Sequence, residues 1–210
     1  MVARIFLNGF NAGRGFAKRG ARAVESELVR IAVAVRDAVA KAPHEKWGAT
    51  VGMGADGTPT KWIDEVAETV LLEQVKTSDI DANILSEEAG LVELDGKNLL
   101  VADPVDGTHN AARGIPFYCV SLALARDRLN DVSEGVVVNA ANGDVYHARK
   151  GRGATLNGQT IQVRPWKEHN DTVSIYMGPE APEAAFESHS RGRRRQVREQ
   201  NRGAVLISVW

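Results

Sequence analysis

The 210-residue chain has little cysteine, no dominant charge and no long apolar run. Its single cysteine, Cys119, cannot form an intrachain disulfide, so we expect a small core residue and a reducing, cytoplasmic location. Lys and Arg number 26 against 27 Asp and Glu, so no overall charge favours nucleic acid or a membrane surface. A bilayer-spanning helix needs about 20 mostly apolar residues. The sequence has no such run, and no membrane partner is expected.

Acidic residues are missing from the start of the chain and aspartate from its end. Residues 1–22 contain no acid, carry five Lys or Arg, and lack the uninterrupted apolar centre of a secretory signal. We expect them to be a disordered basic tail. After Asp171 there is no further aspartate, and residues 179–210 are rich in arginine, so we expect an atypical terminus there. The stretch between, residues 23–178, is expected to form one domain.

Periodic apolar residues predict two helices and several strands. Residues 23–41 place Val and Leu at helical spacing, and a second helix is expected to start near Asp64 and to end near Lys76. Short apolar runs predict strands, and Asn142-Gly143 and Asn157-Gly158 predict tight turns. The sequence therefore predicts an α+β fold in which two helices pack on a mostly antiparallel sheet. The expected strands are residues 84–86, 99–102, 116–125, 134–139, 144–149 and 173–177, and Leu156 and residues 161–163 flank the second turn.

The segment Asp103–Thr108 (DPVDGT) follows the apolar run 99–102 and precedes a short expected helix, residues 108–112. Asp103 and Asp106 are near enough in sequence for a turn to direct both carboxylates, with the Val105 carbonyl, at one cation. Oxygen ligands of this kind suit Mg²⁺. Gly107 lets a phosphate approach the backbone, and the N–H groups of Gly107 and Thr108 would point at it.

These six residues, continued by Asn110, Gly114, Ile115 and Pro116, resemble the signature of the inositol monophosphatase family of Mg²⁺-dependent phosphomonoesterases. The string GADGTPTK at residues 54–61 is most similar to the archaeal inositol monophosphatase/fructose-1,6-bisphosphatase branch. The resemblance implies a layered α/β sandwich of the sugar phosphatase type. It covers residues 23–178, so the N-terminal domain is expected to be present and the C-terminal domain largely missing.

The resemblance also implies roles for particular residues. Glu87 would be a metal ligand that also holds water, and Asp64 would pair with Thr108 to orient the attacking water. Asp103, the Val105 carbonyl and Asp106 would complete the metal ligands, Gly107 and Thr108 would bind substrate, and Glu88 would be an acceptor beside them. The family uses two or three Mg²⁺ ions; fewer are expected here, because the family's C-terminal aspartate has no counterpart.

Three functions remain open from the sequence. The first is hydrolysis of an inositol monophosphate or fructose 1,6-bisphosphate by a homodimer. The second is a truncated, non-catalytic remnant that binds a cation or acts as an interaction module. The third, nucleic-acid binding through the arginines of residues 191–202, is ranked last.

Overall fold

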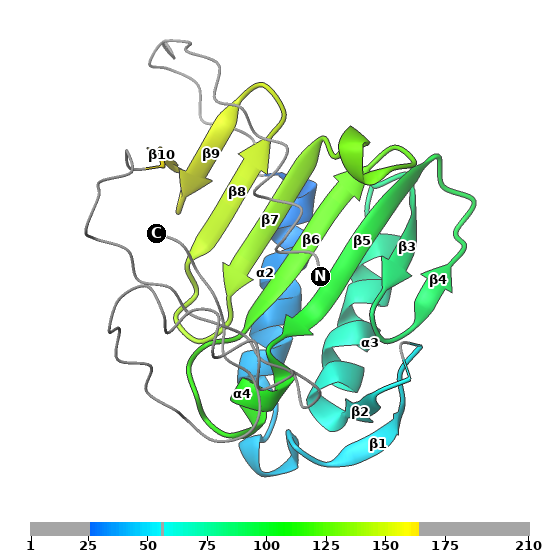
Figure 1. The fold of residues 1–210 in the computed structure, drawn as a ribbon, viewed down its shortest axis with the longest axis vertical. Coiled ribbons are helices and arrows are strands. Elements are labelled where there is room, and N and C mark those ends of the chain that lie inside the picture. Colours follow the sequence, from blue (N-terminus) through cyan, green and yellow to red (C-terminus); the bar gives the residue numbers. More distant parts are fainter. Residues whose placement is uncertain (1–25, 56, 164–210) are drawn as a thin grey trace, which may run out of the picture. The chain divides into compact units, whose positions relative to one another are not determined.

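The computed structural model describes residues 26–55 and 57–163, and every described element lies in one compact unit that ends at Ile161. Eight strands form a single sheet in the order β10-β9-β8-β7-β6-β5-β3-β4 (Figure 1). Neighbouring strands are antiparallel except β3 and β5, which are parallel. The strand bounds are β3 Ala82–Ser86, β4 Gly90–Val92, β5 Asn98–Asp106, β6 Cys119–Ala125, β7 Glu134–Asn139, β8 Val145–Arg149, β9 Gly153–Leu156 and β10 Gln159–Ile161.

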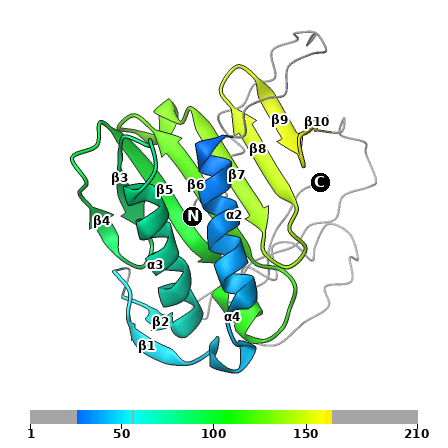
Figure 2. The same cartoon turned by 180° about the vertical axis from the view of Figure 1, so that it is seen from behind.

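Two 15-residue helices, α2 (Glu27–Lys41) and α3 (Trp62–Lys76), lie side by side over one face of this sheet (Figure 2). Their apolar stripes, which include Ile31 and Leu71, pack with Leu122 of β6 in the main core. The expected layered α+β architecture is confirmed. The remaining elements are α4 (Thr108–Ala112), the β1 (Thr50–Met53) and β2 (Pro59–Lys61) hairpin, and the 3₁₀ turns His44–Lys46 and Leu129–Asp131.

The two faces of the central strands have different partners. Leu100 and Ala102 of β5 pack in the helix-side core, whereas Val101 packs with Ala123 of β6 in a separate cluster. Because successive residues of a strand point to opposite faces, Asp103 belongs to the face that carries Val101. The described helices contain no segment long and apolar enough to cross a bilayer.

Several predicted boundaries differ from the structure. The run 99–102 belongs to a longer strand that continues through Pro104 to Asp106, and its register with β6 is broken between Asp103 and Asp106. Proline cannot donate to a ladder, and the irregular register accommodates it.

The strand expected at residues 116–125 begins only at Cys119, so its first three residues were assigned wrongly. They form a loop instead, because the Asn110 side chain donates to the Phe117 carbonyl and ties that loop to α4.

Other predictions on this unit are confirmed. Helix α4 has the expected bounds, and both Asn-Gly turns join antiparallel strands. Sequence analysis predicted neither the β1–β2 hairpin nor β4. Residues 23–25 of the first expected helix and the strand expected at 173–177 lie outside the described residues.

Glu134 connects the start of α2 to the sheet. Its carboxylate accepts hydrogen bonds from the Ser26 hydroxyl at the N-cap, from His147 Nε2 at 2.8 Å and from Arg149 Nε at 3.1 Å. Burial alone would raise the pKa of Glu134, but these donors outweigh it and lower the pKa below its ordinary value. A carboxyl whose pKa is lowered by folding stabilises the folded state above its unfolded pKa.

We therefore expect Glu134→Gln to lower the free energy of unfolding by about 1–3 kcal/mol at pH 7. The difference from the wild type should shrink as the pH falls below about 4.3, the ordinary glutamate pKa, because the wild-type carboxylate then takes up a proton. Urea unfolding between pH 7 and pH 3 measures both effects. Glu27→Gln, which removes an exposed 2.7 Å ion pair with Arg30, is the matched control and should change stability by less than about 0.5 kcal/mol. Equal effects of the two variants would contradict this role of Glu134.

Candidate active site

Asp64 and Thr108 are joined by a hydrogen bond across 44 positions of sequence: the Thr108 hydroxyl lies 2.7 Å from Asp64 Oδ1. Asp64 sits in the first turn of α3, three residues after the N-cap Lys61, whose backbone N–H donates to Asp64 Oδ2 at 2.9 Å. That bond satisfies a free N–H at the helix end and fixes the carboxylate. The structure thus brings together the pair that the resemblance implied.

The Thr108 hydroxyl has a second acceptor, the Val105 carbonyl oxygen, at 2.9 Å. A hydroxyl carries one proton and can accept on its lone pairs. Thr108 can therefore donate a hydrogen bond to Asp64 when Asp64 is ionised, or donate to the Val105 carbonyl and accept a hydrogen bond from Asp64 when Asp64 is protonated. The geometry permits a proton to pass between Thr108 and Asp64 without movement of the backbone.

The pKa of Asp64 is raised from 3.8 to about 6. Burial is the main cause, and the charges of Glu88 and Glu87 add to it, while the hydrogen bonds from Thr108 and Lys61 oppose it. At pH 7 the group is mostly ionised but holds a proton more readily than an exposed aspartate. A carboxylate with a pKa close to the working pH suits general-base chemistry.

Glu87, Asp103 and Asp106 gather where β3 and β5 end. These strands are parallel, with Ser86 beside Ala102, and the Glu87 N–H donates to the Ala102 carbonyl at 3.3 Å. Parallel pairing places the carboxyl ends of both strands together, so Glu87 and Asp103 emerge next to each other.

Asp103 and Glu87 lie close enough for their charges to interact. Burial, followed by the charges of Glu87 and Asp106, raises the pKa of Asp103 far above its usual value. Burial and, to a lesser extent, the charge of Glu87 also raise the pKa of Asp106. Without a cation, these two aspartates therefore hold protons more readily than exposed aspartates do.

The register break in β5 places Asp106 beside Cys119, whose thiol lies 3.9 Å from Asp106 Oδ2. Burial and the nearby charges of Asp106 and Asp103 raise the pKa of the Cys119 thiol, so it remains protonated. The residue that was expected to be a small core residue is partly buried, and its thiol contacts the acidic corner.

Gly107 has a left-handed backbone, with φ of +93°, at the N-cap of α4. A Cβ added here would lie 2.9 Å from the Phe117 carbonyl oxygen and 3.3 Å from Tyr118 Cα. The chain's own packing therefore requires glycine at this position, independently of any ligand.

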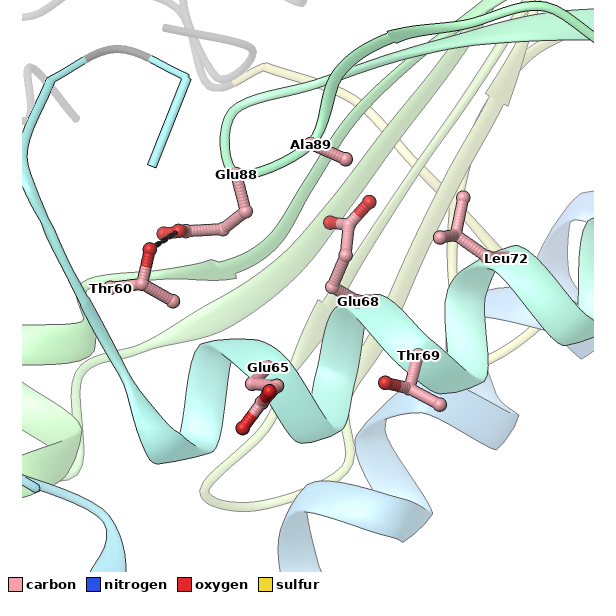
Figure 3. Close-up of a pocket in the computed structure, with 7 residues that line it drawn as sticks. All are labelled: Thr60, Glu65, Glu68, Thr69, Leu72, Glu88 and Ala89. Atoms are coloured by element: carbon pink, nitrogen blue, oxygen red, sulfur yellow. Dashed lines mark hydrogen bonds between the residues drawn. The ribbon is translucent and has the colours of Figure 1, made fainter. Parts of the chain in front are cut away.

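Sequence reasoning missed the residues that hold the Glu87–Glu88 turn (Figure 3). The Ser86 hydroxyl donates to Glu68 Oε2 of α3 at 2.5 Å and accepts the Glu88 N–H at 3.3 Å. The Thr60 hydroxyl donates to Glu88 Oε2 at 2.5 Å, and the expected role of Glu88 beside the metal ligands stays a prediction. Glu68 follows Asp64 by one helical turn, and this spacing was the only signal that could have identified it.

A small cavity of about 170 Å³ lies beside this turn, between α3 and the loop after β3 (Figure 3). It is separate from the corner formed by Asp103 and Asp106. Its lining residues are Thr60, Glu65, Glu68, Thr69, Leu72, Glu88 and Ala89.

The acidic corner fits a hard divalent cation by its chemistry. Within residues 26–55 and 57–163, no three His, Cys, Asp or Glu side chains already surround a point that could hold an ion. The donors at the corner are nevertheless carboxylate and carbonyl oxygens, which Mg²⁺ prefers. Burial is the main cause of the raised pKa values of Asp103 and Asp106, and repulsion from nearby carboxylates adds to it. Positive charge at the corner would offset that repulsion.

The sequence model of the inositol monophosphatase family matches residues 21–205 of the chain. Among curated proteins, the fructose-1,6-bisphosphatase/inositol-1-monophosphatases of Archaeoglobus fulgidus and Methanothermobacter thermautotrophicus are each 42% identical, over 147 and 146 residues. These matches cover 70% and 63% of this chain but 57% and 52% of the relatives. The chain thus spans just over half the length of these relatives. The bifunctional NADP phosphatase/NAD kinase of Methanococcus maripaludis is 41% identical over 128 residues, which are 52% of this chain and 22% of that protein.

Solved structures agree with the sequence comparisons. The crystal structure of an inositol monophosphatase–fructose 1,6-bisphosphatase has a TM-score of 0.64 and 26% identity, over 77% of this chain and 63% of that one. The IMPase of Thermotoga maritima has a TM-score of 0.54 and 27% identity, over 72% and 56% of the two chains. The chain therefore belongs to the inositol monophosphatase family, and the resemblance to its archaeal branch that residues 54–61 and 103–108 predicted is confirmed.

Proposed function

We propose that the protein hydrolyses a phosphate monoester of a small molecule with Mg²⁺ as its cofactor. The observation that carries the proposal is the Thr108–Asp64 hydrogen bond, at 2.7 Å, set beside a corner of carboxyl groups whose pKa values are raised. A group that can orient and deprotonate water thus lies beside oxygens suited to a cation, as phosphomonoester hydrolysis requires.

Glu87, Asp103, the Val105 carbonyl and Asp106 are the proposed Mg²⁺ ligands. When bound, Mg²⁺ would supply positive charge to neutralise the phosphate oxygens and the leaving oxygen. Asp103 is 6% exposed and its pKa is raised by burial and by neighbouring carboxylates, so cation binding is expected to lower that pKa and to release a proton.

Asp64 and Thr108 are the proposed water-activating pair. A water bonded to Thr108 Oγ would transfer a proton to that oxygen while Thr108 passes its own proton to Asp64, and the water oxygen would attack phosphorus. The bond from phosphorus to the ester oxygen would break, and the departing alkoxide would take a proton from solvent. No covalent enzyme intermediate is needed, which agrees with the protonated, unreactive state of the Cys119 thiol.

Gly107 and Thr108 are the proposed substrate contacts, through their backbone N–H groups. The archaeal relatives are named for fructose 1,6-bisphosphate and inositol 1-phosphate, and another relative is named for NADP. All three carry phosphate monoesters, so the proposal is limited to that class, with an inositol monophosphate or fructose 1,6-bisphosphate as first candidates. The homodimer, the cytoplasmic location and the number of ions stay predictions.

The alternative is a non-catalytic module that binds a cation through the same corner. It is supported by the described residues, among which no three His, Cys, Asp or Glu side chains already surround a point that could hold an ion. Binding of Mg²⁺ without release of phosphate from any of the candidate substrates would support this alternative.

Asp103→Asn should reduce Mg²⁺-dependent phosphate release at least about a hundredfold, because the amide cannot balance the charge of the cation. The stabilisation that Mg²⁺ gives to the folded chain should disappear as well. A colorimetric phosphate assay and thermal unfolding with and without Mg²⁺ measure the two effects. Asp144→Asn removes an exposed carboxylate bonded to Asn142 and Asn157 on the β7–β8 turn, and it should change neither. Full activity of Asp103→Asn would refute the metal assignment.

Thr108→Val should lower kcat by about a hundredfold or more and leave the Mg²⁺ dissociation constant nearly unchanged, because only the proton path is lost. Thr108→Ser keeps the hydroxyl and should retain most activity. Steady-state kinetics with calorimetric Mg²⁺ titration separates the two effects. Thr155→Val, which removes a hydroxyl bonded to the His147 carbonyl at 3.4 Å, serves as a control. A large loss of activity in the serine variant would argue against the proton path.

The activity should also depend on the charge of Asp64. The pKa of Asp64 is raised to about 6, and the group accepts a proton only when ionised, so kcat should fall as the pH drops below that value. Asp64→Asn should have low activity, and its kcat should lack this fall at acidic pH (the acid limb of the profile). A pH profile of kcat from 4.5 to 8 tests the assignment, and an unchanged acid limb in the variant would contradict it.

A further inference from the structure

Ser121, in the middle of β6, is completely buried, at 0% exposure, and its hydroxyl has no hydrogen-bond partner in the part of the chain that the structure describes. The other buried serine of the sheet, Ser86, is bonded to Glu68. A buried hydroxyl left unpaired costs about 1–3 kcal/mol. An apolar residue at this position would avoid the cost, so a buried serine here indicates a role for its hydroxyl.

The register of the sheet gives Ser121 a specific neighbour. Ser121 is directly paired with Asp103 of β5 in the antiparallel ladder. Directly paired residues project from the same face of a sheet, with Cβ atoms about 4.5–5.5 Å apart. Asp103 is 6% exposed, so the carboxyl group and the hydroxyl lie together in a region with little access to water.

Asp103 also lies beside Glu87, because β3 and β5 run parallel with Ser86 next to Ala102. A cation held between Asp103 and Glu87 would take one oxygen of the Asp103 carboxylate, and the second oxygen could accept a hydrogen bond. The Ser121 hydroxyl is the donor that the register places opposite it. The strand pattern supports this reading, because Ala123, the next β6 residue on the same face, packs with Val101 and has no polar group to satisfy.

We propose that Ser121 is a positioning residue for the cation site: its hydroxyl donates a hydrogen bond to the Asp103 carboxylate when a divalent cation is bound and so fixes the orientation of that ligand. The inference rests on the proposed function, since it assigns Asp103 as a ligand. Groups that orient a ligand in this way commonly change metal affinity by 10- to 100-fold. The Ser121 hydroxyl is then unpaired in the metal-free chain and bonded to Asp103 when the cation is bound.

Ser121→Ala tests the inference by separating affinity from stability. The Mg²⁺ dissociation constant, measured by calorimetry on the full chain, should rise about tenfold or more. Stability of the metal-free chain in urea should stay equal or increase, because the variant removes an unsatisfied buried hydroxyl. Ser133→Ala, which removes an exposed hydroxyl bonded to the Leu124 carbonyl at 3.3 Å, should leave the affinity unchanged. Ser121→Cys, with a weak donor of similar shape, should fall between wild type and alanine.

The outcomes are distinguishable. If the wild type binds Mg²⁺ and Ser121→Ala binds it equally well, the inference is overturned while the proposed function stands. If Ser121→Ala destabilises the metal-free chain markedly, the hydroxyl has a structural role and the inference is again overturned. Failure of the wild type to bind Mg²⁺ would overturn both the inference and the metal assignment.

Discussion

The site depends on the parallel pairing of β3 and β5, the one parallel pair in the described sheet. Parallel strands end on the same side, so the residues that follow Ser86 and Ala102 are brought together. The glutamate and the aspartate that emerge there repel each other when ionised, and burial strengthens the repulsion. The rest of the fold stabilises this unfavourable arrangement: α3 anchors the glutamate turn through Glu68 and Ser86, and the register break sets the second aspartate beside β6. Repulsion between these carboxylates would be relieved by a cation, which agrees with the proposed Mg²⁺ site.

The proposed water-activating pair, Asp64 and Thr108, is held by different contacts. Asp64 is fixed by the backbone of its own helix, and Thr108 follows a left-handed glycine that the loop after α4 packs against. Helix α3 therefore contributes twice, with Asp64 in its first turn and Glu68 one turn later. One helix thus positions both Asp64, the proposed proton acceptor, and the turn that carries Glu87, so these two parts of the site are held in a fixed relation to each other.

Sequence reasoning found the elements that depend on local pattern. The helical periodicity of α2 and α3, the Asn-Gly turns and the segment Asp103–Thr108 are all local signals, and the structure contains each of them. The pairing of Asp64 with Thr108 came from family resemblance, since nothing in the intervening residues links them. What was missed depends on register: the three-residue strand β4, the irregularity at Pro104, and the partners of Ser86, Glu68 and Ser121. Spacing along a chain does not specify which residues face each other across two strands.

The outermost strands described in the sheet, β4 and β10, have three residues each, whereas β5 in the interior has nine. An outer strand exposes unpaired N–H and C=O groups, which can recruit a strand from another molecule and begin aggregation. Three residues offer only a brief template for such pairing. Leu91, at the centre of β4, is an apolar side chain that remains 59% exposed on this outer strand. The short outer strands therefore protect the longer interior strands, including β5 with its two aspartates, from pairing with a strand of another molecule.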